Sequence, residues 1–254
     1  MAAQTTLDLN SDMGESYGAW KMGDDEAVLG YVSSANIACG FHGGDPSTLR
    51  KTVAAAIKQG VALGAHPGFQ DLAGFGRRNM HISPQEAYDI TVYQVGAVAG
   101  VARSQGGALH HVKAHGAFYN MAAKDARLAR AIAQAVHDID SSLIFYGLAG
   151  SAMIQEAQAL GLRVANEVFG DRSYQPDGSL TPRAQPDAMI TDVNKSVEQI
   201  LRMVQEQVVV ATDGTRVPVQ PDTLCIHGDQ PNAVVFAQGI RKALEDAGIT
   251  VRTV

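Results

Sequence analysis

The sequence predicts an α/β protein built as a single β/α barrel, and two observations lead to that prediction. Short apolar segments alternate with longer amphipathic segments along all 254 residues, which is typical of a parallel sheet covered by helices. About eight such units follow one another, and a barrel of this length is common as one domain. The expected barrel is TIM-like, with an irregular or seven-stranded form allowed. A doubly wound open sheet is the alternative, because sequence patterns determine neither strand order nor closure.

Eight short apolar segments are expected to be strands. They are residues 5–10, 34–38, 61–65, 109–113, 143–146, 163–167, 223–226 and 249–252. Amphipathic stretches between them, such as 45–60, 83–107 and 230–249, are expected to be helices. The first of these opens with Asp45-Pro46 and closes at Gly60, a pattern that marks the start and the end of a helix.

Two stretches interrupt this alternation, at residues 171–187 and 208–222. Each contains a turn dipeptide, Asp177-Gly178 in the first and Asp213-Gly214 in the second, and such dipeptides favour tight hairpins. We therefore expect one domain over residues 1–254 that carries two hairpin-like insertions.

Composition argues against several classes of protein. The net charge is −6 and no stretch is strongly basic, so nucleic acids and anionic membranes are poor partners. No apolar run is long enough for a transmembrane helix, and the first residues lack a signal-peptide pattern. The two cysteines, Cys39 and Cys225, fit a reducing compartment. A cytoplasmic protein is expected.

Polar side chains gather at the C-terminal ends of the expected strands. Asp8, Asn10 and Asp12 alternate with Leu7 and Leu9, so the three polar residues share one strand face. The polar residues at or just after these strand ends are Asn10, Asp12, His42, His66, Lys113, His115, Glu167, Asp171, His227 and Asp229. Loops of β/α barrels meet at that end, which predicts an active site there rather than a purely structural ion network.

Several of these residues have competing roles. Asp12 suits a cation or a general base, but helix capping or turn formation is the alternative. Arg77 and Arg78 suit carboxylates or phosphates, although a salt-bridged loop is equally compatible. Asp12, His42 and His66 together form the ligand set expected for a water-activating metal.

Six stretches taken together resemble the LamB/YcsF family. They are DLNSDMGES, SANIACGFHGGDP, GAHPGFQDLAGFGRR, HVKAHGAFYN, EVFGDRSYQPDGSLTPR and CIHGDQPNA, in consistent order from residue 7 to about residue 235. Ala114 and Gly170 stand where the family usually has Pro and Ala, and neither difference removes a functional group.

The resemblance implies a barrel similar to those of glycoside hydrolases and sugar deacetylases. It also implies ATP-dependent 5-oxoprolinase activity, in which the lactam of 5-oxo-L-proline is opened to L-glutamate by this chain together with B and C subunits. ATP is therefore expected as a cofactor, although the chain has no recognised nucleotide motif. Mg²⁺ at Asp12 is left open, a transition metal is not expected, and a homo-oligomer is left open.

We assign roles within that reaction as hypotheses. The expected catalytic residues are Asp12, Glu15, Lys113 and His115. The residues expected to bind substrate or phosphate are Asn10, His42, His66, Arg77, Arg78, Glu167, Arg183, His227 and Asp229. Two rival functions remain: a metal-dependent amide or sugar deacetylase that uses Asp12, His42 and His66 as ligands, and a non-catalytic subunit that presents 5-oxoproline to its partners.

Overall fold

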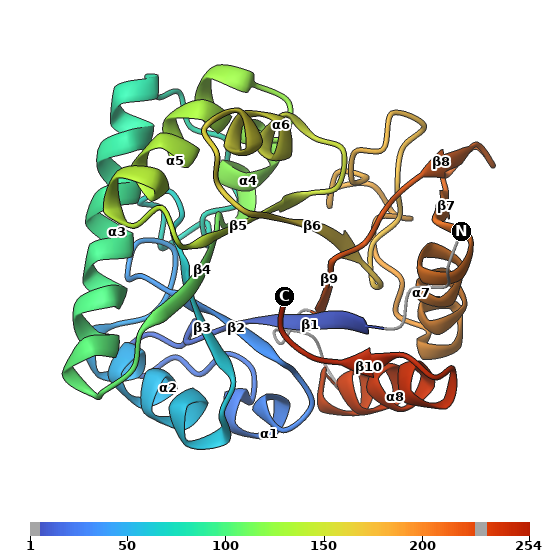
Figure 1. Cartoon of the computed structure of the whole chain (residues 1–254), viewed down its shortest axis with the longest axis horizontal. Coiled ribbons are helices and arrows are strands. Elements are labelled where there is room, and N and C mark those ends of the chain that lie inside the picture. The colour runs from blue at the N-terminus through green and yellow to red at the C-terminus, as the bar shows by residue number, and fades with distance from the viewer. Residues whose placement is uncertain (1–5, 227–232) are drawn as a thin grey trace.

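A computed structural model describes residues 6–226 and 233–254, and within these residues seven parallel strands form a closed ring. The strands are β1 (Thr6–Met13), β2 (Ser34–Ala38), β3 (Ala62–His66), β4 (Leu109–Lys113), β5 (Ile144–Leu148), β6 (Val164–Phe169) and β9 (Thr223–Ile226). The ring closes because β1 pairs with both β2 and β9, and helices surround it (Figure 1). The predicted barrel is confirmed in its seven-stranded form, and the open sheet is excluded.

The eighth expected strand exists but does not join the ring. β10 (Thr250–Val251) pairs only with the first residues of β1, Thr6 and Leu7. It cannot extend further along β1, because β9 occupies that edge from Asp8 onward. The residues after β10 cover the N-terminal end of the barrel, where the backbone N–H of Arg252 donates to the Leu7 carbonyl oxygen at 3.1 Å.

Helices lie between most of the strands and pack outside the ring (Figure 1). They are α1 (Asp25–Leu29), α2 (Pro46–Gln59), α3 (Pro84–Ser104), α4 (Gly116–Ala122), α5 (Ala126–Ile139), α6 (Ala152–Ala159), α7 (Val193–Glu206) and α8 (Ala233–Asp246). The sequence signals for α2 are confirmed, since Asp45 caps its first turn and Gly60 ends it in a left-handed conformation. No helix within the described residues is both long and apolar enough to cross a membrane.

The two interrupting stretches lie against each other. β7 (Val208–Val210) and β8 (Arg216–Pro218) form an antiparallel pair. In the stretch at 171–187, Tyr174 forms an isolated antiparallel bridge with Leu180. The backbone N–H of Thr212 donates to the Tyr174 carbonyl oxygen at 2.9 Å and so ties one stretch to the other.

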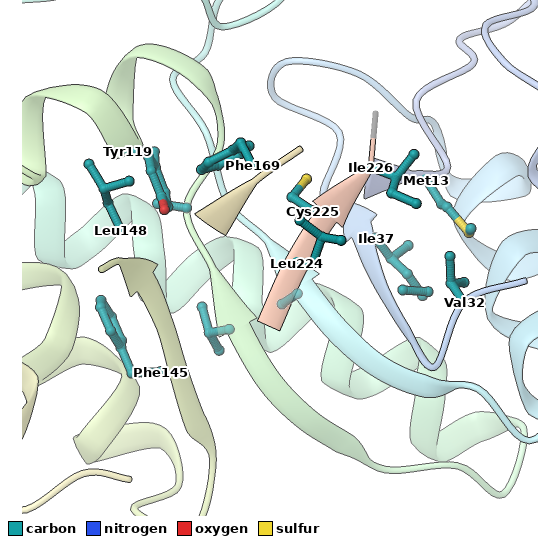
Figure 2. Close-up of a cluster of buried hydrophobic side chains, with 14 of the residues drawn as sticks. Met13, Val32, Ile37, Tyr119, Phe145, Leu148, Phe169, Leu224, Cys225 and Ile226 are labelled. Carbon is teal, nitrogen blue, oxygen red and sulfur yellow. The ribbon is translucent and has the colours of Figure 1, made fainter. Parts of the chain in front are cut away.

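The two faces of the strands differ in polarity. Leu7 and Leu9 of β1 belong to the apolar core, whereas Asp8, Asn10 and Asp12 make polar contacts across the barrel, as their alternation predicts. Figure 2 shows buried apolar side chains that several strands and neighbouring segments contribute to the core. β1 runs past the expected end at residue 10, because its last residues pair with β2 in register up to Met13. Asp12 is therefore held on a strand rather than on a loop.

Candidate active site

A cavity of about 590 Å³ lies at the C-terminal ends of the strands, and seven of the predicted site residues line it. These residues are Asp12, Glu15, His66, Arg77, Lys113, His115 and Arg183. The wall is completed by α4 and by residues 179–183 of the first insertion. The site thus lies at the end of the barrel that the strand pattern indicates.

Lys113 is a buried cation, only 2% exposed, held between two buried carboxylates. Its Nζ lies 2.9 Å from Oδ1 of Asp12 and 2.8 Å from Oε1 of Glu167. It also donates to Oδ1 of Asn10 at 3.2 Å and lies 3.1 Å from the sulfur of Cys225. Burial would lower the pKa of Lys113, but the surrounding negative charge, that of Asp12 above all, holds it well above its usual value. Lys113 is therefore charged at neutral pH.

Amides behind the cavity position this cluster. Asn36 Nδ2 donates to Asp12 at 2.9 Å and to Asn10 at 2.7 Å, and His111 Nε2 donates to the Asn36 side-chain oxygen at 2.8 Å. Asn10 Nδ2 in turn donates to Glu167 at 3.1 Å. The network fixes the orientation of both carboxylates that hold Lys113.

Three imidazoles and a carboxylate form a second cluster beside the lysine. The rings of His42 and His115 are stacked with centroids 3.6 Å apart, and His66 stands nearly perpendicular to both. Ligand atoms of these three histidines and of Glu15 all lie within 4.8 Å of one another. Burial, together with the neighbouring imidazoles, holds the pKa values of His42 and His115 well below the usual value, so both rings are neutral near pH 7.

The loop that carries the two predicted arginines also shapes the histidine cluster. Phe75 and Gly76 both have positive φ, 54° and 61°, and the Phe75 carbonyl oxygen accepts from His115 Nε2 at 2.8 Å. Arg77 lines the cavity and lies over the Phe75 ring. Arg78 forms an ion pair with Asp71 on the same loop and is not among the residues that line the cavity. The two arginines, adjacent in sequence, therefore occupy different environments.

The structure separates the remaining predicted residues into three groups. Asn10 and Glu167 support the cavity floor through Lys113 without lining the cavity. His42 lies behind His115, completely buried. His227 and Asp229 fall outside the described residues.

Two cationic side chains of the cavity, Lys124 and Arg172, were not among the predicted site residues. Arg172 is buried, and its guanidinium donates to the carbonyl oxygens of Ala188 at 3.2 Å and Thr181 at 2.6 Å. Burial, with a contribution from Arg183, lowers the pKa of Arg172 to about 10. It follows Asp171 in the sequence, which suggests a simple ion pair. Only the folded insertion shows that it lines the cavity instead.

The match to a family model covers almost the whole chain. The model of the LamB/YcsF family matches residues 7–254. The chain belongs to the LamB/YcsF family. The resemblance carried by the six motifs is thereby confirmed.

Two close LamB/YcsF relatives are informative. A protein of Bordetella pertussis, named as the A subunit of 5-oxoprolinase, is 70% identical over 246 residues, which make up 97% of this chain and 98% of that protein. The crystal structure of a lactam utilization protein from Thermus thermophilus is 49% identical and superposes with a TM-score of 0.92, covering 98% of this chain and all of that one (100%).

A more distant structure supports the expected likeness in fold. A T48 deacetylase with 14% identity has a TM-score of 0.51 over 99% of this chain and 89% of its own. At that identity it shows only a shared barrel architecture.

Proposed function

We propose that this chain is the A subunit of an ATP-dependent 5-oxoprolinase and that its cavity binds 5-oxo-L-proline. Family membership and the name of a 70% identical relative support the activity. The observation that carries the assignment to the cavity is Lys113, a buried ammonium on the cavity floor between Asp12 and Glu167. A buried charge placed where a ligand binds suits a substrate oxygen that gains negative charge during the reaction.

The cavity offers complementary groups for the rest of the substrate. Arg183 and Arg172 line one wall and suit the carboxylate of 5-oxoproline. Neutral His115 and the carboxylate of Glu15 lie on the other side and suit proton transfer. Lys113 would polarise the lactam carbonyl, which is otherwise a poor electrophile.

ATP would supply the driving force for opening an unstrained lactam. Arg77 and Lys124 line the same cavity and suit phosphate oxygens. Mg²⁺ bound to the phosphate oxygens would neutralise their charge. We further propose that B and C subunits complete the enzyme, in keeping with the subunit named in its relatives. A cytoplasmic location stays a prediction.

The test is ATP-dependent glutamate formation from 5-oxoproline, measured with the chain alone and with its B and C partners. We expect turnover from the complex and little or none from the isolated chain. Lys113→Ala in the complex should lower turnover by about 10²–10³-fold. Full ATP-coupled turnover by the isolated chain would refute the need for partners, and an active Lys113→Ala complex would refute the cavity assignment.

Two rival functions give different results in the same assay. A metal-dependent amide or sugar deacetylase, which the histidine cluster favours, would hydrolyse its substrate without ATP. A non-catalytic subunit would bind 5-oxoproline, and cavity variants would then change the substrate KM of the complex but not its kcat.

A further inference from the structure

The histidine cluster contains an arrangement that the proposed reaction does not explain. His66 Nδ1 donates to the carbonyl oxygen of Lys113 at 2.8 Å, and His115 Nε2 donates to that of Phe75 at 2.8 Å. A carbonyl oxygen only accepts, so these two nitrogens each carry a hydrogen. The other nitrogens, His66 Nε2 and His115 Nδ1, face each other across 3.0 Å, and with one hydrogen per ring both would point lone pairs into that gap.

Two carboxylate oxygens lie around the same gap. Asp12 Oδ2 is 3.3 Å from His66 Nε2, and Glu15 Oε1 is 3.6 Å from His115 Nδ1. The four atoms thus follow one another at 3.0 to 3.6 Å, from Asp12 to His66 to His115 to Glu15, and all four side chains are buried. Lys113 pairs with the other oxygen of Asp12, but the two facing nitrogens repel each other unless a positive charge lies between them.

The spacing of these atoms matches the coordination shell of a small metal ion. Ligand atoms placed 2.0–2.2 Å from a tetrahedral Zn²⁺ are themselves about 3.3–3.6 Å apart, close to the 3.0, 3.3 and 3.6 Å that separate the three neighbouring pairs here. Imidazoles that ligate a metal commonly donate their other N–H to a carbonyl oxygen, as both rings do here. We propose that His66, His115, Asp12 and Glu15 bind one divalent transition-metal ion at the C-terminal end of the barrel.

His42 belongs to this site in a different capacity. Its ring is parallel to that of His115, with 3° between the planes and 3.6 Å between the centroids. One ion cannot lie in the planes of two rings stacked in this way, so His42 and His115 cannot both be well-oriented ligands. His42 Nε2 lies 3.4 Å from Glu15 Oε1, so we assign His42 a positioning role beside that carboxylate. The proposed ligand set differs from the one expected from the sequence, in which His42 stands in place of His115 and Glu15.

Binding of this ion can be tested independently of the proposed lactam chemistry, because the measurement needs neither 5-oxoproline nor ATP. The full chain, purified with a tag that lacks histidine and without chelators, is analysed for metal content. Metal-stripped protein is then titrated with Zn²⁺ by calorimetry and with Co²⁺ by visible absorption. We expect one ion per chain, Co²⁺ bands of a nitrogen–oxygen site, and no competition from millimolar Mg²⁺, which prefers all-oxygen sites.

Three variants separate the assigned roles. His66→Ala and His115→Ala should each weaken Zn²⁺ binding by well over about 100-fold, whereas His42→Gln should weaken it by about 10–100-fold, as expected for a positioning residue. His137→Ala is the matched control, because this histidine is on the surface and its loss should leave affinity unchanged. Circular dichroism confirms folding of each variant, and Zn²⁺ should raise the melting temperature of the wild type but not of His66→Ala.

Three results would overturn the assignment: no stoichiometric ion in the wild type, affinity unchanged in both His66→Ala and His115→Ala, or Mg²⁺ binding as tightly as Zn²⁺. The first would mean that the two facing nitrogens share a proton. None of these results would bear on 5-oxoproline turnover by the complex.

Discussion

Replacing Lys113 by Met should destabilise the isolated chain strongly, because it removes the positive charge shared by two buried acids. Glu167 is 0% exposed and does not line the cavity, so its carboxylate cannot be rehydrated without opening the barrel, and Asp12 is only 8% exposed. Removal of one partner from a buried ion pair costs about 3–5 kcal/mol. For a chain of 254 residues, each kcal/mol lowers the melting temperature by about 2–4 °C, which gives a decrease of about 6 to 20 °C.

The assay is a thermal melt followed by circular dichroism at neutral pH, with Glu167→Gln and the double variant measured in parallel. If the charge is the cause, Glu167→Gln should restore part of the stability that Lys113→Met removes, because fewer unpaired charges stay buried. A Lys113→Met protein that melts within about 2 °C of the wild type would refute this reasoning. A double variant less stable than either single variant would refute it as well.

Other parts of the structure lead to three more expected outcomes. Arg183→Ala should raise the KM for 5-oxoproline in the assembled enzyme. Arg78→Ala should leave this KM unchanged, since Arg78 pairs with Asp71 and does not line the cavity. Equal changes of KM in steady-state kinetics would contradict this. Gly76→Ala should cost about 1–3 kcal/mol in chemical denaturation, because φ is +61° and a Cβ would lie 2.8 Å from Cδ2 of His115 and 2.8 Å from Cβ of His42. Gly100→Ala, in open space on α3, is its control and should stabilise by up to about 1 kcal/mol. Asp45→Ala should cost about 1–2 kcal/mol by removing the cap of α2. Hydrogen bonds from the backbone N–H groups of residues 18 and 48 lower the pKa of Asp45 to about 2. The difference in the free energy of unfolding between the wild type and Asp45→Ala should therefore be complete above about pH 4 and be lost as the pH falls toward 2. A difference that persists at pH 2 would exclude an electrostatic origin.

Much of the architecture could be predicted from periodicity, because parallel strands and their helices leave local signatures. The alternation of Asp8, Asn10 and Asp12 with leucines indicates a strand with a polar inner face, and the contacts across the barrel agree. Strand order is not local, however. That β10 stays outside the ring depends on β9 pairing with β1, and no pattern within residues 249–252 shows it.

The candidate site was predictable to the extent that it rests on strand ends. Lys113 and His66 end their strands, so their convergence follows from barrel geometry alone. Arg172 and Arg78 were harder to assign because their partners lie on loops. Arg78 is held by Asp71, and Arg172 by carbonyl groups of the insertion. Such contacts depend on how each loop folds and not on residue spacing.

The pairing of β1 with β9 has a consequence for synthesis of the protein. Asp12 emerges from the ribosome near the start of translation, but the strand that closes the ring begins at Thr223. At 5–20 residues per second this leaves about 10 to 40 s in which β1 has an unpaired edge, and once β6 has been made the nascent sheet has two, β1 and β6. Neither the cavity nor the contact between Lys113 and Cys225 can exist during that interval. A chain truncated before β9 keeps both edges exposed, and exposed edges of apolar strands pair with other chains.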